Sequence, residues 1–366
     1  MIAPEVGSEW PGDDLPVVII GAGQAGLAAG YQLGKRGVAF QIVDAGARVG
    51  DSWRRRYASL TLFTPRRYSA LPGLTPSGDP DSYPSADEFA SYLDEYARHH
   101  QLAVRSATRV EKLTRLPDGR FELGLSTGEI ARCRSVIIAT GGFQTAALPT
   151  VAKELGPSVH QLTITNYRTP KDIIGRSVLV VGDGATGRDI ATELSATHSV
   201  LLATGKSRRR LPERILGRSI WWWLSRTGLL RAGSRSPIGR RMRQADPFPN
   251  RGRSLEELAH RGVKIVGRVV GAEGRGVRFS DGNTVEIDSV VWAVGYRDET
   301  AWVQIRGAVD DRGQFAHEAG LSPVPGLFFV GRPWQRNRAS GLIMGAGDDA
   351  AVIAQAIVRT SVGAMA

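Results

Sequence analysis

The feature that most constrains the fold of this chain is a glycine pattern that occurs twice, 161 residues apart. GAGQAG begins at Gly21 and GDGATG begins at Gly182. Each follows a short apolar run and precedes a helix-forming stretch, so each predicts a strand, a tight turn and a helix. In such a unit the first glycine turns the chain, the second lets the backbone approach a pyrophosphate, and the third lets helix pack on strand. The helix N-terminus then faces the phosphates with its positive dipole end. The chain therefore predicts two dinucleotide-binding units.

The residues that follow the second strand of each unit distinguish the two nucleotides. Asp44 lies 23 residues after Gly21, where an acid binds a free ribose hydroxyl. The second unit has Thr204 in that place, followed by Ser207, Arg208 and further basic residues, and no acid occurs from Leu194 to Pro212. A hydroxyl and guanidinium groups hold a 2′-phosphate that a carboxylate would repel. The alternative for these arginines is a solvated basic loop.

The remaining strands predict how the two units are assembled. Strand-like runs end in small residues at 139–142 and again at 293–295, so each unit closes in the same way. A further short apolar strand at 326–331 and the helix after it leave too little chain for a third unit. We expect an α/β fold with two Rossmann-like domains, the first formed by residues 12–168 and 299–366 and the second, residues 169–298, inserted into it.

Composition excludes several classes of function. The formal net charge of +11 is local, because residues 206–243 hold 12 Lys and Arg against one acid, and the rest of the chain holds 35 of each sign. Nucleic-acid signatures are missing, so we expect no nucleic-acid partner. Cys133 is the only cysteine, which leaves no internal disulfide, no cysteine zinc cluster and no C-x-x-C pair. We predict no metal site.

The sequence also lacks a signal peptide and a long apolar span, so a cytoplasmic location is expected.

Residues 214–233 form an unusual insert with three consecutive tryptophans and several arginines. One interpretation is a hydrophobic lid or substrate tunnel over the first domain; the other is a helix lying at a membrane surface, which would make the protein peripheral to the membrane. We favour the lid. Both interpretations imply a hydrophobic substrate or surface. The oligomeric state stays open, with a homodimer as one possibility.

The order of GAGQAG, Asp44, GDSW, ATGG, GDGATG and WAVGY resembles the flavin-containing monooxygenases, including their bacterial CzcO-like branch, over nearly all of residues 15–360. The segment 49–57 is similar to that family's G-G-x-W-x-x-x-Y, with Asp51 in place of the second glycine. The resemblance implies a glutathione-reductase-like flavoprotein with FAD on the first loop and NADPH on the second. It also implies dioxygen as co-substrate and oxygenation of a small hydrophobic molecule through a C4a-(hydro)peroxyflavin. Alternatives are a flavin reductase with another electron acceptor and a flavin-bound sensor or interaction protein without turnover.

The resemblance also implies site residues. FAD contacts are expected at Gly21, Gly23, Gln24, Ala25, Gly26, Asp44, Ala45, Gly50, Ser52, Trp53, Val110, Ala139, Thr140, Gly141, Gly331 and Trp334. NADPH contacts are expected at Gly182, Gly184, Ala185, Thr186, Gly187, Thr204, Ser207, Arg208, Ala293, Gly295 and Tyr296. Candidates for catalysis, from loops expected to face the flavin, are Thr64, Gln335 and Arg338.

One segment departs from the family. Monooxygenases of this kind carry F-x-G-x-x-x-H-x-x-x-[WY] before the second loop, and the matching stretch here is LGPSVHQLTITNYRTP. An alignment on Tyr167 puts Thr163 in the histidine position, whereas an alignment on Gly156 puts His160 there. We favour the first alignment, and it raises the question of whether oxygen chemistry is coupled efficiently to NADPH oxidation.

Overall fold

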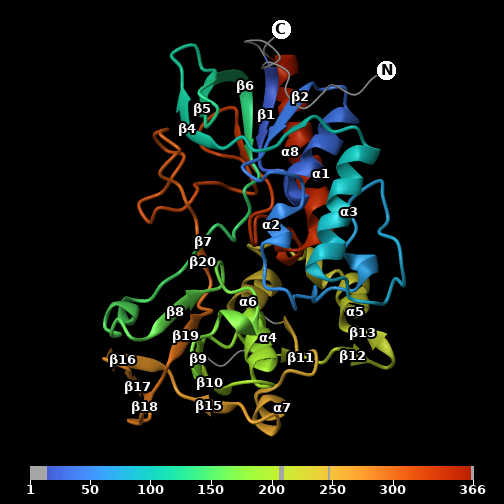
Figure 1. Cartoon of the computed structure of the whole chain (residues 1–366). Coiled ribbons are helices and arrows are strands. Elements are labelled where there is room, and N and C mark those ends of the chain that lie inside the picture. Colours follow the sequence, from blue (N-terminus) through green and yellow to red (C-terminus); the bar gives the residue numbers. More distant parts are fainter. Residues whose placement is uncertain (1–14, 206–209, 246–247, 364–366) are drawn as a thin grey trace.

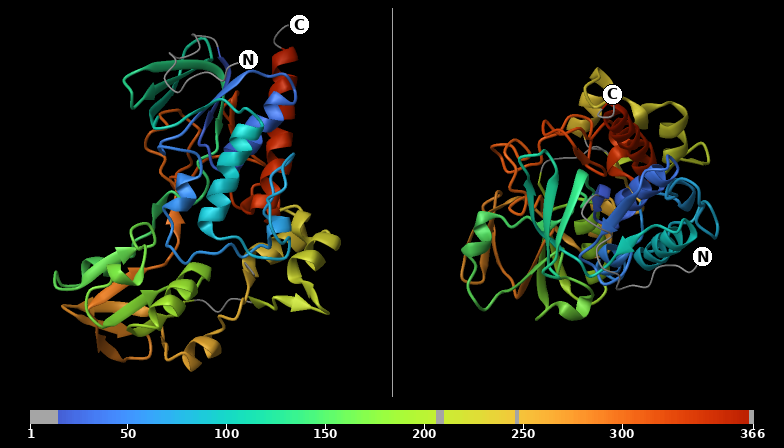
Figure 2. Two further views of the ribbon diagram at one scale, coloured as in Figure 1. Left: turned by 45° about the vertical axis from the view of Figure 1, so that its right-hand side comes forward. Right: turned by 90° about the horizontal axis from the view of Figure 1, so that it is seen from above.

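The structure is a computed structural model, and it describes residues 15–205, 210–245 and 248–363. Two lobes, each built on its own sheet, lie one above the other in Figure 1, and Figure 2 shows the same separation from a second side. The first lobe contains both ends of the described chain, and the middle of the chain forms the second lobe.

The sheet of the first lobe has the strand order β3–β2–β1–β6–β5–β4, with β21 also paired to β6. β3, β2, β1, β6 and β21 run parallel, and β4, β5 and the first half of β6 form an antiparallel meander. The strands are β1 (Leu15–Ile20), β2 (Phe40–Val43), β3 (Val104–Arg105), β4 (Val110–Arg115), β5 (Phe121–Leu125), β6 (Ile130–Ile138) and β21 (Leu327–Phe329).

Both faces of this sheet are covered, which follows from the unbroken apolar runs of its central strands. Val17 and Ile19 point toward α1 (Gln24–Gly34), α3 (Ala86–His99) and α8 (Ile343–Gly363), whereas the alternate residues Val18 and Ile20 face the meander and the chain around 303–329. α3 begins at a capping box in which Ser85 and Glu88 bond each other's backbone N–H. These contacts hold the first glycine loop at the carboxyl edge of the sheet.

The main sheet of the second lobe is wholly parallel, with the order β15–β10–β9–β19–β8. One face packs against α4 and α7, and the other against the small antiparallel sheet β16–β17–β18. The elements are β8 (His160–Thr163), β9 (Ser177–Val181), α4 (Ala185–Leu194), β10 (Ser199–Ala203), α7 (Leu255–His260), β15 (Lys264–Val266), β16 (Val269–Glu273), β17 (Gly276–Phe279), β18 (Thr284–Glu286) and β19 (Ser289–Trp292).

The chain passes between the lobes through a two-stranded ribbon of β7 (Thr145–Ala146) and β20 (Tyr296–Arg297). Because β8 pairs with β19, residues 160–163 join the second sheet, whereas the first domain was expected to extend to residue 168. We therefore propose that the first domain boundary lies close to β7. The short turns of the linking segments are η2 (Thr150–Lys153) and η3 (Pro170–Asp172).

The tryptophan-rich insert folds back onto the first lobe. Ile220, Trp221 and Leu230 are buried in one cluster with Ala339 and Leu342, and the indole N–H of Trp221 donates to the carbonyl oxygen of Phe63 at 2.9 Å. These contacts favour the lid over a membrane helix, because the apolar face of α5 packs against protein. The elements here are α2 (Asp51–Arg54), η1 (Arg66–Tyr68), β11 (Arg210–Leu211), β12 (Arg214–Ile215), β13 (Arg218–Ser219), α5 (Ile220–Arg226), η4 (Leu229–Arg231), α6 (Pro237–Ala245), β14 (Phe248–Pro249) and η5 (Arg338–Gly341).

Candidate nucleotide sites and active site

The first glycine loop joins β1 to α1 and requires glycine at two of its positions. Gly21 has a φ of +109°, and a Cβ added to it would lie 2.8 Å from the carbonyl oxygen of Ala139. A Cβ on Gly26 would lie 1.8 Å from the carbonyl oxygen of Gly21. Gly23 instead faces open space and begins α1 with no side-chain cap and no acid in the first turn. Uncapped N–H groups with an open approach suit a pyrophosphate, so the residues present fit the predicted dinucleotide.

Asp44 lies where the ribose of that dinucleotide is expected. Its carboxylate accepts hydrogen bonds from the backbone N–H groups of Ala22 and Gly46, each at 2.6 Å. The backbone N–H of Thr108 donates to the carbonyl oxygen of Asp44 at 2.8 Å, which brings the chain leading to Val110 beside it. Ala45 follows Asp44 and is exposed.

The segments expected beside the flavin meet at the start of α1. The indole N–H of Trp53 donates to the Gln24 side-chain oxygen at 3.2 Å, and a Cβ on Gly331 would lie 2.5 Å from the Cβ of Ala25. Gly141 faces open space, as Gly23 does. The segments that make these contacts carry the predicted residues Gly50, Ser52, Trp53, Ala139, Thr140, Gly141, Gly331 and Trp334.

The second loop repeats the backbone geometry of the first. Gly182 has a φ of +108°, and a Cβ on Gly187 would lie 1.8 Å from the carbonyl oxygen of Gly182. Gly184, like Gly23, begins its helix without a side-chain cap or an early acid. The loop holds the predicted residues Ala185 and Thr186. It meets Ala293 at the end of β19, because a Cβ on Gly182 would lie 2.4 Å from that residue's carbonyl oxygen.

The side chains of the second loop are charged where those of the first are apolar. Arg188, 1% exposed, donates to the carboxylate of Asp183 at 3.2 Å and to the carbonyl oxygen of the same residue at 2.9 Å. The other carboxylate oxygen of Asp183 accepts from the backbone N–H of Gly205 at 3.3 Å. Thr204 donates to the carbonyl oxygen of Val266 at 3.1 Å. Ser207 and Arg208 lie outside the described residues, so their assignment to a 2′-phosphate stays a prediction.

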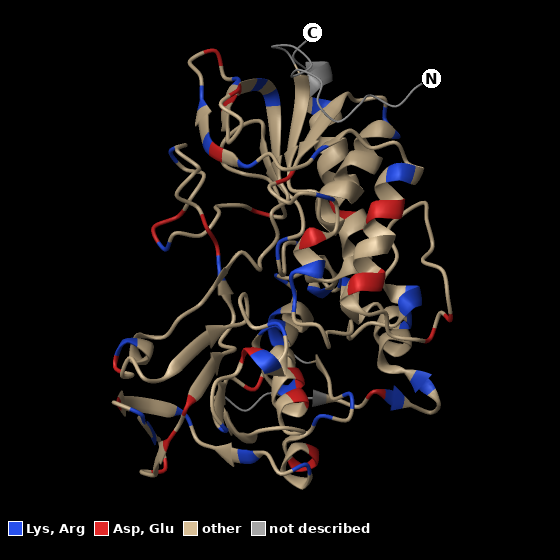
Figure 3. Ribbon diagram, viewed as in Figure 1, with Lys and Arg blue, Asp and Glu red and all other residues tan. Residues whose placement is uncertain are grey.

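Basic residues gather where the lobes meet. Figure 3 shows several Lys and Arg stretches between the lobes, among them those around α2. The guanidinium of Arg168 donates to the carbonyl oxygen of Arg56 at 3.0 Å. Burial, followed by repulsion from Arg55 and Arg56, lowers the pKa of Arg168. Like charges held together in this way fit a polyanionic coenzyme between the lobes.

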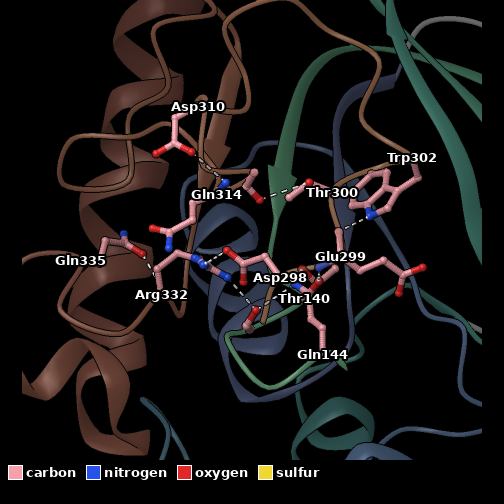
Figure 4. A network of polar contacts seen from close by, with 12 residues as sticks. Thr140, Gln144, Asp298, Glu299, Thr300, Trp302, Asp310, Gln314, Arg332 and Gln335 are labelled. Atoms are coloured by element: carbon pink, nitrogen blue, oxygen red, sulfur yellow. Dashed lines mark hydrogen bonds and ion pairs between the residues drawn. The ribbon is translucent and has the colours of Figure 1, made fainter. Parts of the chain in front are cut away.

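A network of polar contacts, drawn in Figure 4, ties the end of β6 to the chain that returns from the second lobe. Gln144 donates to the Thr140 hydroxyl at 2.6 Å and accepts from the backbone N–H of Glu299 at 2.7 Å. Arg332 forms a buried ion pair with Asp298 and donates to the carbonyl oxygen of Gly141 at 2.8 Å. The edge of the first sheet is therefore held directly against the interlobe connection.

The three candidates for catalysis occupy different environments. Gln335 is 4% exposed, and its amide donates to the carbonyl oxygen of Phe329 at 2.9 Å and accepts from the N–H of Arg332 at 3.2 Å. Its amide contacts the backbone in this way, and a role at the flavin stays a prediction. Thr64 is 3% exposed and bonds to Ser69 at 2.8 Å. Arg338 is half-buried and lies over the ring of Trp334.

The structure also bears on the two alignments of the histidine fingerprint. In β8, His160 pairs with Ser289 at the start of the parallel strands, whereas Thr163 pairs with Trp292 at their carboxyl ends. Ligands of open parallel sheets bind beyond the carboxyl ends of the strands. Tyr167 is fully buried. This geometry supports the alignment on Tyr167, in which Thr163 takes the place of the family's histidine.

Cys133 is fully buried in β6, and burial raises the pKa of its thiol to about 12. The thiol is therefore not a redox nucleophile. Within residues 15–205, 210–245 and 248–363, the structure contains no cluster of three His, Cys, Asp or Glu side chains arranged to bind a metal ion. In the same part of the chain, no helix combines the length and the apolar character needed to span a bilayer.

Sequence reasoning missed the polar contacts between the lobes, made by Arg56, Tyr57 and Asp189, and the polar contacts within the second lobe made by Asp183, Arg188 and Arg253. One signal was available. Asp183 and Arg188 are opposite charges inside a loop and helix start whose equivalents in the first unit, Ala22 and Leu27, are apolar.

Two glycine loops in separate lobes, which the β7–β20 ribbon connects, define a fold with two dinucleotide-binding units. Residues 18–215 match the model of the pyridine nucleotide-disulphide oxidoreductase family. A CzcO-like oxidoreductase of Geobacillus kaustophilus is 40% identical over 91% of this chain and 95% of its own. The chain belongs to this oxidoreductase family, and the predicted likeness to its CzcO-like branch is confirmed.

Two further comparisons support the flavin-dependent monooxygenase fold. The flavin-containing monooxygenase from Stenotrophomonas maltophilia superimposes with a TM-score of 0.80 at 25% identity, covering 96% of this chain and all of that one. The rice indole-3-pyruvate monooxygenase YUCCA1 is 28% identical over 86% of each chain. Together with the family match, these likenesses confirm the predicted α/β fold of two dinucleotide-binding units and support FAD and a pyridine nucleotide as cofactors.

Proposed function

We propose that this protein is an NADPH-dependent FAD monooxygenase that oxygenates a small hydrophobic molecule. The observation that carries the proposal is the pair of nucleotide-binding loops with opposite chemistry at the ends of their second strands, a carboxylate in one and a threonine in the other. One nucleotide with a free ribose and one with a phosphorylated ribose match this difference.

The residues that would hold FAD are those of the first loop with Asp44, and those that would hold NADPH are the second loop with Thr204, Ser207 and Arg208. FAD, when bound, accepts electrons from NADPH and passes them to dioxygen. The chain supplies binding and orientation: uncapped N–H groups face the phosphates, and the interlobe arginines balance the charge of the coenzyme.

The lid supports a hydrophobic substrate. Trp221, 2% exposed, packs with Ala339 and Leu342 and lies close to Phe63, the neighbour of Thr64. These side chains cover part of the first lobe with apolar groups, and a substrate that binds beneath them would be shielded from water. Thr64 and Arg338, which both lie beside this cover, remain the candidates for contact with the reacting atoms.

The experiment is an assay of the yellow protein with NADPH in air, with and without sulfides, amines and ketones. The proposal expects substrate-dependent oxygen uptake and an oxygenated product that gains one atom from labelled dioxygen. NADPH oxidation that yields only hydrogen peroxide with every substrate would count against it.

A second candidate is an NADPH-dependent flavin reductase that passes electrons to an acceptor other than oxygen. It is favoured by Thr163, which lacks the imidazole of the family's fingerprint. An anaerobic assay with quinones and dyes separates the two, since a reductase turns over there and a monooxygenase stops after one reduction. Disulfide reduction by a dithiol is ruled out, because Cys133 is the only cysteine in the sequence.

A further inference from the structure

We propose that Tyr57 and Asp189 are positioning residues: their buried contact fixes the second glycine loop relative to the flavin-side segment 50–57, and so sets the rate at which NADPH reduces the flavin. This inference rests on the proposed function, because it needs NADPH on the second loop and FAD on the first.

Tyr57 belongs to the first lobe by sequence but is buried in the core of the second. It is 3% exposed and packs in the same cluster as Tyr167, Ile190 and Leu194. Its hydroxyl donates to the carboxylate of Asp189 at 2.9 Å. Asp189 lies in α4, the helix that begins at the second glycine loop. One tyrosine thus reaches across to the start of α4.

The residue before it contacts the other end of the same nucleotide site. Arg56 donates to the hydroxyl of Tyr296, which follows β19, and its guanidinium lies 5.1 Å from the centre of that ring. Consecutive residues therefore contact two elements of the second site. Tyr57 contacts α4, which begins at the glycine loop, and Arg56 contacts Tyr296 of β20, the strand that follows β19. Three residues earlier the same chain forms α2, whose Trp53 bonds to Gln24 of the first loop.

Asp189 is also fixed by an ion pair on the side that faces away from Tyr57. Its second carboxylate oxygen forms an ion pair with Arg253, and the side chains are 11% and 23% exposed. The carbonyl oxygen of Arg253 accepts from Arg188 at 2.6 Å, and Arg188 in turn holds Asp183 of the loop. A continuous set of buried polar contacts therefore runs from the second loop to the flavin-side segment. Each group has a partner, which is the condition under which a buried polar network rigidifies its surroundings.

Loss of a contact between the lobes changes the distance between the two nucleotides, whereas loss of a contact within one lobe does not. Small displacements of a bound reactant lower rates steeply, with about 1 Å costing up to on the order of a hundredfold. Removing the Tyr57 hydroxyl breaks an interlobe bond and leaves both glycine loops intact. The expected loss therefore falls on electron transfer between the nucleotides and leaves the binding of either one nearly unchanged.

The test compares Tyr57→Phe with Tyr167→Phe. Tyr167 is equally buried and donates to Glu193 on the same helix at 2.8 Å, but this bond lies within the second lobe. We expect the rate constant of anaerobic flavin reduction at saturating NADPH to fall about tenfold in Tyr57→Phe and less than twofold in Tyr167→Phe. FAD content, NADP⁺ affinity and the reoxidation of dithionite-reduced flavin by oxygen should match the wild type in both.

A second variant, Asp189→Ala, and the double variant Tyr57→Phe/Asp189→Ala complete a double-mutant cycle. The double variant should slow reduction no more than the larger single change does. The unfolding midpoints of the flavin-free variants should also be non-additive. This measurement detects the coupling between Tyr57 and Asp189 independently of enzyme activity. Asp189→Asn, which can still accept from Tyr57, should restore most of the rate lost in Asp189→Ala.

Three results would overturn the inference: equal rates in Tyr57→Phe and wild type, equal losses in Tyr57→Phe and Tyr167→Phe, or additive losses in the cycle. If Tyr57→Phe does not fold, the comparison of Asp189→Asn with Asp189→Ala decides the question alone. Failure of the nucleotide assignment on which the inference rests has a different signature, since NADPH would then not reduce the flavin of the wild type at all, whereas a wild type that is reduced but oxygenates no substrate would count only against the monooxygenase activity.

Discussion

The two glycine units share one backbone and differ in where they place charge. Gly21 and Gly182 each donate to the residue that ends the second strand, at 2.8 and 3.0 Å, and Ala139 and Ala293 each donate to the end of the first strand at 2.8 Å. On this frame, Ala22 and Leu27 of the first unit correspond to Asp183 and Arg188 of the second.

In both units a hydrogen bond joins the glycine loop to the residues after the second strand, but the segment that supplies the carboxylate differs between the two units. In the first unit, Asp44 after the strand accepts from the N–H of Ala22 in the loop. In the second, Asp183 in the loop accepts from the N–H of Gly205 after the strand. In the second unit the acid lies in the loop, and Thr204 occupies the position that Asp44 has in the first unit. The hydrogen bond between loop and strand end is therefore kept without a carboxylate at the position expected to face the 2′-phosphate. Arg188 neutralises the relocated acid.

The largest expected effect comes from the third glycine of each loop. Gly26→Ala and Gly187→Ala both place a Cβ 1.8 Å from a carbonyl oxygen, too close for either loop to keep its shape. We expect Gly26→Ala to be colourless or insoluble, and Gly187→Ala to be yellow but not reduced by NADPH. Flavin content and anaerobic bleaching measure both. A Gly187→Ala protein that is reduced at the wild-type rate would break the assignment of the second loop.

The next effect concerns the charges inside the second loop. Arg188→Leu leaves the buried carboxylate of Asp183 unpaired and should lower the free energy of unfolding by about 3–5 kcal/mol. The double variant Asp183→Ala/Arg188→Leu installs the residues of the first loop and should recover most of this loss, because apolar groups of suitable size often replace a buried ion pair at little cost. Urea unfolding of the apoprotein measures both. Equal destabilisation in the single and double variants would show that the two loops are not interchangeable in packing.

Selectivity for the 2′-phosphate gives a smaller effect. Arg208→Ala should raise the KM for NADPH about 10- to 100-fold, as expected for the loss of a charge-assisted hydrogen bond of about 1.5–3 kcal/mol, and leave the KM for NADH unchanged. Arg261→Ala removes an exposed arginine of the second lobe; it is the control and should change neither KM. If KM rises equally for both coenzymes, Arg208 does not contact the 2′-phosphate.

The smallest effect concerns a difference between the two sheets, because Cys133 is fully buried in the first sheet and is the only cysteine in the sequence. Burial raises the pKa of the Cys133 thiol to about 12, so the folded state resists ionisation and should lose stability as the pH rises from about 9 toward 12. Cys133→Val should remove this loss, and the native wild type should not react with a thiol reagent at neutral pH. Thermal unfolding across the alkaline range checks the first point. A stability profile unchanged by the substitution would contradict it.

The fold could be predicted from the sequence because glycine spacing and apolar runs are local signals, and together they indicate one structure, the strand–turn–helix unit of a dinucleotide-binding domain. Gly21, Gly26, Gly182 and Gly187 all meet the steric conditions that their spacing implied. β8 was not predicted as part of the second sheet, since a four-residue strand between prolines is a weak local signal and gains its place by pairing with β19.

The polar contacts could not be predicted, because they depend on tertiary neighbours. The amide of Gln335 donates to the carbonyl oxygen of Phe329 and accepts from the N–H of Arg332, and no local sequence pattern indicates these two partners. Tyr57 was recognised as part of a motif, yet its partner Asp189 lies 132 residues away. Only the folded chain brings these groups together.

The most direct test of the central claim, that the two loops hold different nucleotides, is an anaerobic titration of the FAD-loaded protein with NADPH and, separately, with NADH. The account predicts that one equivalent of NADPH bleaches the flavin and that NADH does so only at much higher concentration. A flavin that stays oxidised with NADPH, or that is reduced equally well by both coenzymes, would contradict it.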